Sequence, residues 1–558
     1  MLDGNKAFRA LPGRALRGER WIWWAAPLGM FALVAMPLIV LASYWWVPDE
    51  SGTWEHLRRY VLADYVVNSL AILVGVAALV GPVGVTTAWL VAAYEFPWRR
   101  HFEWLLVLPL ALPTYIIAFT YGGMLDEVGP VQKTLRGMMG WSIGDVSLPP
   151  IRSLGGVILV MSLVLYPYVY LICRAVIATQ IQHLSDVSQI MGLRGASRFF
   201  RIVLPLVRPA LVAGTGLALM EALGDFGSVS FFGVDTFTTG IYRAWFNLED
   251  VGSAARLSTM LMLFIFVLIL VERWSRKNLH VEVANQPVGI RRVRLEGWHR
   301  GATSALCGLL VMLGFVVPVG QLMWWAASRW QVVWGSEYLW MVGRTFGLAA
   351  GVAILIVAAA LWVRFSQRLT KSMVVELLGR ATGLGYAVPG SVLSVGIMVS
   401  LGQTGSWWNG VTQGWGWEGV VLTGTLGALS YAYAVRFFAV AYGGLDGGFA
   451  RIPQQVDEAA LCLGRKPWQL LGAVHVPLLK GSLLSAGALV WIDILKELPA
   501  TIILRPFNFD TLATKTYELA KGELLPDASV YALSIVLVGV LPVMLLVRSM
   551  GGGKEGSE

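Results

Sequence analysis

Charged residues are scarce in this chain. Asp, Glu, Lys and Arg make up 14% of its 558 residues, whereas 56% are hydrophobic and the mean hydropathy is +0.65. Soluble globular proteins carry roughly 25% charged residues. Apolar runs of about 20 residues, the length that a helix needs to cross a bilayer, recur along the sequence. The sequence therefore predicts an all-α polytopic membrane protein.

Cysteine and histidine are also few. The three cysteines, Cys173, Cys307 and Cys462, form no close pair and no CxxC motif. The six histidines are scattered and show no HxxxH spacing. These absences argue against a disulfide framework and against a zinc site.

A phosphate-binding loop is missing as well. The C-terminal stretch Gly551-Gly-Gly-Lys554 lacks the glycine spacing and the Ser or Thr that such a loop needs. No nucleophile stands beside a general base in any recognisable pattern. We therefore expect a chain that is not an enzyme and that binds no cofactor of its own.

Twelve membrane spans are predicted, six before and six after a polar, basic stretch. The first six lie at about residues 23–47, 67–94, 102–124, 153–177, 208–232 and 257–272, and the second six at 303–327, 341–364, 380–402, 418–442, 481–504 and 528–548. This divides the chain into a first half (residues 1–272), a basic linker (residues 273–302) and a second half (residues 303–558). The first run is interpreted as a retained span, with a cleaved signal as the alternative.

Basic residues are unevenly distributed among the loops. The N-terminal tail, the linker and the loops near Arg99 and Arg368 all fall on one side if each half has six spans. Positively charged loops stay in the cytoplasm, so both termini are expected there. The net charge of +9 is explained by these loops and gives no reason to expect a nucleic acid partner.

An internal repeat connects the two halves. The segment from Asp186 to Gly192 matches the segment from Glu458 to Gly464, and each is followed by a proline, Pro205 or Pro477. The two glycines and the two prolines are both 272 residues apart (464 − 192 and 477 − 205). The spans between the copies are even in number, so the two repeats are expected to be parallel.

Each repeated loop, at about residues 184–206 and 456–478, is predicted to form two short helices joined at the glycine, which permits a sharp turn. A helix pair of this kind on the cytoplasmic face suits docking into a groove on a partner. The alternative is an ordinary interfacial helix-turn-helix. Two copies in register at equivalent loops favour the docking interpretation.

The loops resemble the E-A-A-x3-G-x9-I-x-L-P signature of permeases of ATP-binding-cassette importers. The second half matches it with valines in place of Ile and Leu; the first half departs at its start, where Asp186, Val187 and Ser188 replace E-A-A. In that family the loop couples to an ATPase subunit. The residues that carry the match are Gly192, Ile202, Leu204, Pro205, Glu458, Ala459, Ala460, Gly464, Val474, Val476 and Pro477.

Four acids lie in the predicted fifth spans, as the pairs Glu221 with Asp225 and Asp493 with Glu497. Each pair has i, i+4 spacing, which predicts that both carboxylates share one helix face. A charge at membrane depth is costly unless it is paired or hydrated, so such acids often line a pathway. They could contact a cationic cargo transiently. Alternatively, they cap a broken helix, or they pair with bases such as Arg436.

The sequence around these acids resembles ferric-iron permeases with two fused halves. The resemblance covers Glu221 to Tyr242 in the first half and Lys496 to Thr514 in the second. It implies a type I importer permease in the bacterial inner membrane, a periplasmic substrate-binding protein and a cytoplasmic ATPase dimer that holds the ATP. Thiamine, a polyamine, an oxyanion or a phosphonate are alternative cargoes, and an ion-driven secondary transporter is an alternative class.

Prolines interrupt both predicted third spans, at Pro113, next to Tyr115, and at Pro389. Proline removes a backbone hydrogen bond and kinks a helix. A kink inside a membrane is tolerated where a cavity or a neighbour satisfies the freed carbonyl. These residues are therefore predicted to line the translocation pathway, or to form a static kink.

Overall fold

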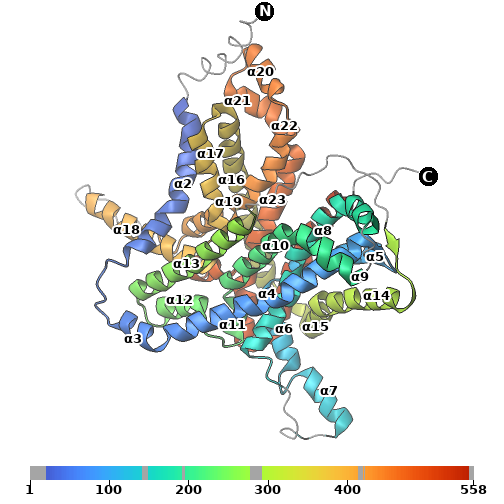
Figure 1. The fold of residues 1–558 in the computed structure, drawn as a ribbon. Coiled ribbons are helices and arrows are strands. Elements are labelled where there is room, and N and C mark those ends of the chain that lie inside the picture. Colours follow the sequence, from blue (N-terminus) through green and yellow to red (C-terminus); the bar gives the residue numbers. More distant parts are fainter. Residues whose placement is uncertain are drawn as a thin grey trace, which may run out of the picture. The chain divides into compact units, whose positions relative to one another are not determined.

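The structure is a computed structural model that describes residues 20–140, 142, 149–190, 195–276, 292–412, 419 and 421–551. It is helical almost throughout, as predicted (Figure 1). The only sheet in the described part is a parallel pair of two-residue strands, β1 (Tyr94–Glu95) and β2 (Val293–Arg294). The chain folds into two compact units, which are described separately below.

The compact units do not coincide with the two halves of the sequence. Unit 1 comprises residues 1–48 and 340–511, and unit 2 comprises residues 49–339 and 512–558. The first predicted span thus belongs to the unit formed mostly by the second half. The seventh and twelfth predicted spans belong to the unit formed mostly by the first half.

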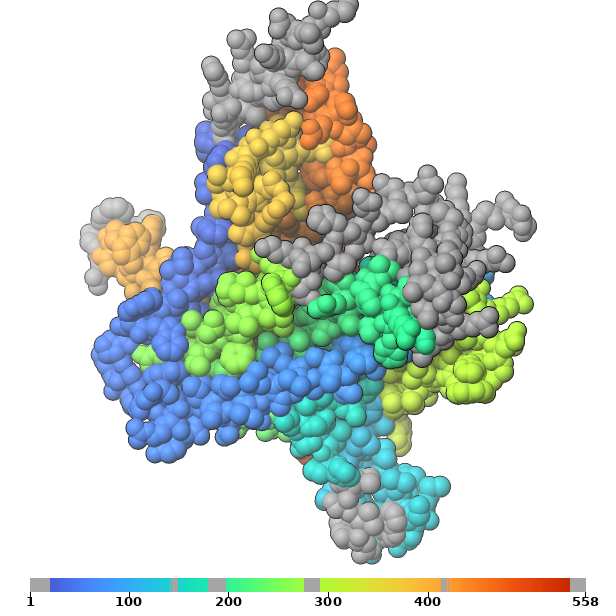
Figure 2. Space-filling view, viewed as in Figure 1, coloured from blue at the N-terminus to red at the C-terminus, as the bar shows by residue number. Residues whose placement is uncertain are grey.

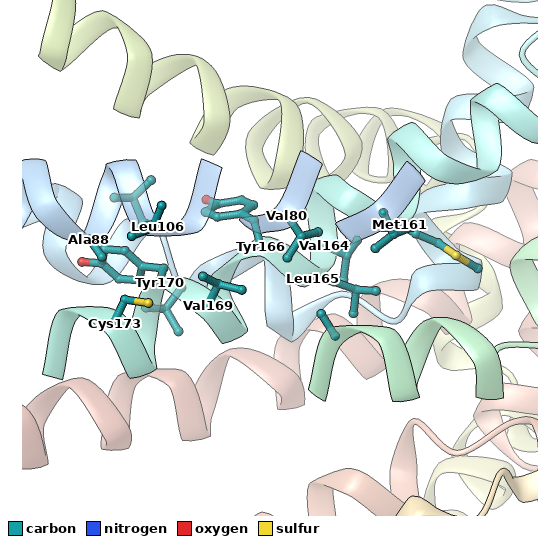
Figure 3. Packing of buried hydrophobic residues seen from close by; sticks show 14 of the residues in the cluster. Val80, Ala88, Leu106, Met161, Val164, Leu165, Tyr166, Val169, Tyr170 and Cys173 are labelled. Atoms are coloured by element: carbon teal, nitrogen blue, oxygen red, sulfur yellow. The ribbon is translucent and has the colours of Figure 1, made fainter. Parts of the chain in front are cut away.

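Unit 2 is built around three long helices that touch through glycines. Val169 of α8 lies against Gly84 of α4 and Gly214 of α10, where an added Cβ would come within 2.5 and 2.7 Å of Val169. Small residues allow this close approach between membrane helices. Figure 3 shows the neighbouring apolar core, with Tyr166 and Tyr170 of α8 among aliphatic side chains. The helices of unit 2 are α3 (Thr53–Tyr60), α4 (Leu62–Ala93), α5 (Arg99–Leu105), η1 (Leu108–Ala111), α6 (Thr114–Leu125), α7 (Pro130–Met139), α8 (Leu154–Ile190), α9 (Gly195–Arg198), η2 (Phe199–Val203), α10 (Leu204–Gly224), α11 (Gly227–Phe231), α12 (Phe237–Phe246), α13 (Val251–Arg276), α14 (Gly297–Val311), η3 (Met312–Val316), α15 (Val317–Ala327), η4 (Trp330–Trp334), α25 (Leu512–Lys521) and α26 (Leu525–Gly551).

Unit 1 packs in the same way. Gly448 of α19 meets Ser482 of α23, and Gly396 of α18 meets Pro37 of α2, with an added Cβ reaching within 2.5 and 2.9 Å of these neighbours. The helix α2 therefore packs against α18, and it also contacts α17. The helices of unit 1 are α2 (Arg20–Ser43), α16 (Ser336–Thr370), α17 (Met373–Thr382), η5 (Gly383–Ala387), α18 (Gly390–Thr412), α19 (Leu426–Ala450), α20 (Gln454–Cys462), α21 (Pro467–Leu470), η7 (Leu471–His475), α22 (Val476–Leu478), α23 (Lys480–Leu495) and α24 (Pro499–Leu504).

Each of the twelve predicted spans has a helical counterpart. Seven helices in the described part are long and apolar enough to cross a membrane, and three bent helix pairs raise this number to ten. The remaining two predicted spans correspond to α19 and to α26, whose described apolar part, Leu525–Leu541, is shorter. The linker differs from its predicted bounds: α13 extends into it as far as Arg276, and β2 and α14 begin before residue 302.

Three π-helical turns occur at related positions. Each ends two residues before a proline: η2 before Pro205, η3 before Pro318 and η7 before Pro477. A proline in a helix clashes with the carbonyl four residues earlier, and a π-turn relieves that clash by widening the backbone. The turns η2 and η7 lie 272 residues apart (471 − 199), so the repeat seen in the sequence is also a repeat in backbone geometry.

Candidate functional site

The second repeated loop has the predicted helix–glycine–helix form. Helix α20 ends in a turn in which Arg465 N donates to Ala460 O (3.1 Å) and Gly464 N donates to Leu461 O (3.0 Å). This is the Schellman pattern, which needs a left-handed residue after the helix. Gly464 supplies it with a φ of +79°. The prediction that Gly464 permits the sharp turn is confirmed.

The outer face of this loop is exposed. Glu458, Ala459, Cys462 and Gly464 are all exposed, and Leu463 at the tip is 84% exposed. Figure 2 shows the orange segment that contains α20 to α22 at the surface of the molecule. The loop therefore offers a short helix with an apolar tip to a partner.

The other matched residues of the loop range from buried to exposed. Ala460 is buried, Val474 is half-buried in η7, and Pro477 lies exposed in α22. The E-A-A segment thus has its first two residues outward and its third inward. Sequence reasoning alone did not assign these directions.

The first repeated loop differs from its prediction. No separate helix precedes its glycine, because α8 continues without a break through Asp186 to Ile190. In the second half, Pro453 separates α19 from α20 with an extended backbone (ψ 147°). The residue 272 positions earlier is Ile181, which carries a backbone N–H and so allows the helix to continue. Gly192 lies outside the described residues.

The rest of the first loop resembles the equivalent segment of the second loop in helix position and burial. Ile202 lies in η2, and Leu204 and Pro205 open α10. Ile202 is half-buried and Pro205 is exposed, like Val474 and Pro477 in the second half.

The two predicted proline breaks are present. Pro113 stands between η1 and α6, where the paired helices bend by 89°, and Pro389 stands between η5 and α18, where they bend by 112°. Tyr115 follows the first break and is buried. The predicted pathway role of these three residues stays a prediction.

The acid pairs do not lie on single helix faces, so that prediction is wrong. The helix α10 ends at Gly224 and α23 ends at Leu495, so Asp225 and Glu497 follow the helices rather than belonging to them. In the second half the reason is Pro499, whose preceding residues cannot easily stay helical. In each half the backbone then enters a short helix, α11 in the first half and α24 in the second.

Asp225 and Glu497 cap those short helices. Asp225 accepts a hydrogen bond from Ser228 N (2.8 Å), and Glu497 accepts one from Ala500 N (3.1 Å), both three residues further along. Capping carboxylates satisfy otherwise unpaired N–H groups at a helix start. The equivalence of the two acids in sequence is therefore an equivalence of role.

The same two acids also hold the proline breaks. Thr114 Oγ1, next to Pro113, donates to Asp225. In unit 1, Arg436 Nε lies 3.1 Å from Glu497, and Arg436 Nη1 donates to Val388 O (3.2 Å), next to Pro389. An added Cβ on Gly390 would come within 2.5 Å of Glu497 Oε1. Each acid thus joins two broken helices of its own unit.

Glu221 and Asp493 occupy the last turn of their helices and are half-buried. Asp493 forms an ion pair of 2.8 Å with Lys496. The described residues contain no cluster of three or more His, Cys, Asp or Glu side chains arranged to hold a metal ion. If Glu221 and Asp493 contact a cation, each unit contributes one of these two acids.

Three tyrosine hydroxyl groups link neighbouring helices. Tyr170 donates to Glu103 O (3.0 Å), Tyr431 donates to Leu33 O (2.6 Å), and Tyr433 lies 2.6 Å from Thr501 Oγ1. These contacts favour the interhelical role over contact with a cargo.

A buried polar cluster beneath the second loop was not predicted. Asp457, next to Glu458, accepts from Arg368 Nε (2.5 Å), and its other oxygen lies 2.8 Å from His475 Nε2. Burial raises the pKa of Asp457, but the hydrogen bonds from His475 and Arg368 outweigh it and hold the pKa below its usual range. Only the position of Asp457 directly before the E-A-A segment gave a signal in the sequence.

Comparison with known proteins shows what the chain is similar to. Residues 81–280 match the family described as "Binding-protein-dependent transport system inner membrane component". The chain is 25% identical over 500 residues to the Fe(3+)-transport system permease protein FbpB 2 of Haemophilus influenzae, covering 88% of this chain and 91% of that protein. Part of the chain therefore matches this family, and most of the chain is similar to a ferric-iron permease.

Other relatives of the chain differ in the cargo that their names give. The ferric transport system permease protein FbpB of Actinobacillus pleuropneumoniae is 21% identical over 543 residues, which cover 93% of this chain and 75% of that protein. The sulfate transport system permease protein CysT of Salmonella typhimurium is 28% identical over 224 residues, covering 40% of this chain and 76% of CysT. These two ferric-iron permeases are thus similar to most of the chain, whereas this sulfate permease is similar to less than half of it.

Proposed function

We propose that the chain is a permease that moves ferric iron across the bacterial inner membrane. A periplasmic binding protein delivers the iron, and a separate cytoplasmic ATPase dimer drives alternating access. The observation that carries the proposal is the similarity to Fe(3+)-transport permeases over 88% of the chain. The coupling surface is the exposed face of α20 with Leu463 at its tip. In this proposal both termini and both repeated loops are cytoplasmic.

Glu221 and Asp493 are the acids proposed to meet the cargo. Asp225 and Glu497 already satisfy backbone and side-chain donors at the helix breaks. A hard trivalent cation prefers oxygen ligands, and carboxylates supply them with compensating charge. Contact during passage is transient, so an acid in the last turn of a helix suits it better than an acid that caps a helix break.

Radiolabelled ferric-iron uptake tests the cargo. Proteoliposomes that contain the permease and its ATPase are supplied with the iron-loaded binding protein, with and without internal ATP. ATP-dependent iron uptake that an ATPase-inactive partner abolishes supports the proposal. Uptake that follows a proton or sodium gradient instead, without ATP, would place the protein among ion-driven transporters.

Sulfate is the second candidate cargo, because sulfate permeases share up to 28% identity with part of the chain. The same vesicles are tested with labelled sulfate and a sulfate-binding protein. Removing negative charge at Glu221 and Asp493 should impair iron uptake and has no such reason to impair sulfate uptake.

The single exposed cysteine provides a direct test of ATPase docking. Cys462 on α20 is exposed, whereas Cys173 and Cys307 are buried. Binding of the ATPase over α20 should slow maleimide labelling of Cys462 in the unmodified protein. Labelling at an unchanged rate, with the ATPase present in excess, would argue against docking at this loop.

A further inference from the structure

A cluster of three polar side chains lies beneath the second repeated loop, inside unit 1. Asp457 comes from α20, Arg368 from the end of α16, and His475 from the last residue of η7. Arg368 and Asp457 are nearly buried, with 12% and 15% of their side chains exposed, and His475 is fully buried. The cluster therefore joins three elements away from solvent.

Arg368 satisfies several acceptors at once. Besides Asp457 Oδ2, it donates to the carbonyls of Phe449 (3.0 Å), Ile452 (2.8 Å) and Pro453 (3.0 Å). These carbonyls belong to the end of α19 and to the break before α20, where the regular ladder of helical hydrogen bonds is interrupted. The planar guanidinium can serve such a set because its donors point in fixed, divergent directions.

His475 completes the cluster from the other side. Its Nε2 lies 2.8 Å from Asp457 Oδ1, and its ring lies between Phe365 (centroid distance 5.2 Å) and Phe449 (5.4 Å). Its Nδ1 is buried and has no hydrogen-bond partner in the described part of the chain. An imidazole with a proton on Nε2, donating to Asp457, fits these surroundings.

The Asp and His of this cluster are not repeated in the sequence of the first half. At the offset of 272 residues, Asp457 corresponds to Ser185 and His475 to Val203. The cluster thus belongs to the second loop, and the general need to form a loop does not explain it.

We propose that Asp457 is a positioning residue for energy coupling: through Arg368 and His475 it fixes α20 to the end of α16 and to the start of the span that follows η7, so that displacement of α20 moves these elements together. The inference rests on the proposed ATPase docking at α20. Asp457 itself does not contact the ATPase, because it faces inward while Glu458 and Ala459 face outward. A rigid polar network of this kind has two discrete states, made or broken, and so can transmit a movement.

Substitutions at His475 separate hydrogen bonding from packing. H475Q keeps an N–H donor near the position of Nε2, whereas H475F fills the aromatic surroundings without any donor. D457N keeps the shape of Asp457 but removes its charge. The control is D446N, because Asp446 forms an ion pair of 3.0 Å with Arg364, also on α16, that does not involve α20.

The measurement uses the full permease with its ATPase and loaded binding protein in proteoliposomes. Two quantities are read: protection of Cys462 from maleimide by the ATPase, and stimulation of ATP hydrolysis by the loaded binding protein. We expect H475F and D457N to keep Cys462 protection within about twofold but to lose stimulation by about tenfold, a coupling effect of ordinary size. H475Q and D446N should resemble the wild type.

Two results would overturn the inference. In one, H475F and D457N are stimulated as strongly as the wild type. In the other, the variants lose protection and stimulation in equal proportion, which would make the cluster a support of the docking face only. If H475F does not reach the membrane, D457N against D446N decides between these outcomes. A wild type that itself shows neither protection nor stimulation would instead contradict the proposed function.

Discussion

At the scale of single residues, the two acids that follow the broken helices have a role that their charge alone did not reveal. Asp225 and Glu497 each cap a short helix and hold a proline break. A carboxylate that only caps can be replaced by an amide with little loss, because asparagine is also a good capping residue. A carboxylate that binds a cation cannot be replaced by an amide without loss of function, because the amide carries no negative charge.

This difference gives a prediction for the first half. D225N should keep most of the iron uptake. D225A should lower the stability of the detergent-solubilised protein by about 1 kcal/mol through loss of the cap. E221Q should reduce iron uptake by at least about tenfold through loss of a cation ligand. Uptake and thermal unfolding are measured on the same preparations. Equal loss of uptake in D225N and E221Q would show that both carboxylates need their charge.

Gly390 gives a second prediction at this scale. An added methyl group would come within 2.5 Å of Glu497 Oε1 and within 3.2 Å of Arg436 Nη1, so G390A should separate this buried ion pair. Breaking a buried pair costs about 3–5 kcal/mol. The expected result is a clear fall in the midpoint of thermal unfolding. G402A on the same helix is the control, since its nearest neighbour atom lies 3.9 Å away.

At the scale of elements, the two repeated loops show how one residue changes a connection. Pro453 breaks the chain between α19 and α20, whereas Ile181 leaves α8 continuous. The turn after α20 depends on Gly464 in the left-handed conformation. The second loop is therefore a separate, exposed helix with its own end signals.

The turn of this loop should be sensitive to a single methyl group. G464A places an L-residue in the left-handed region, at a cost of about 1–2 kcal/mol, and should weaken the protection of Cys462 by the ATPase. G464N should be milder, because asparagine tolerates this conformation. G472A in η7 is the control, since that glycine is exposed and has open space around its Cβ position. Identical protection in G464A and the wild type would contradict the role of the turn.

The loop should also respond to acid. The pKa of Asp457 is held below its usual range, so the stability contributed by this carboxylate is present above about pH 4, the pKa of an unfolded Asp. It is lost as the pH falls through the lower, folded value. The unfolding midpoint of the wild type should therefore fall toward that of D457N as the pH is lowered from 7 to 3. A constant difference between the two proteins across this range would exclude the predicted linkage.

At the scale of the whole molecule, neither half of the sequence makes a complete unit. The first helix, α2, packs on α17 and α18 of unit 1, while α14, α15 and α26 pack within unit 2, where α15 contacts α6 and α26 contacts η1. Each half therefore gives helices to the unit that the other half mostly builds. The fused chain ensures that these partners are always present together.

This exchange predicts how a divided permease behaves. Residues 1–286 and 287–558 produced as separate chains should co-purify, and each produced alone should be recovered poorly, because its unit lacks helices from the other chain. Affinity purification through a tag on one fragment measures the association. Full recovery of each fragment alone, with no association on mixing, would contradict the exchange.

The sequence by itself determined the membrane class, the helical segments that correspond to the predicted spans, the repeat of the proline-linked π-turns and the glycine turn of the second loop. These follow from apolar runs, proline and glycine positions and a fixed offset, which are all local signals. Only the tertiary structure decided that Asp225 and Glu497 cap broken helices, that α2 packs with the second half, and that Arg368, Asp457 and His475 meet beneath α20. Those facts depend on which distant residues come together, and a single sequence does not encode such pairings in any local pattern.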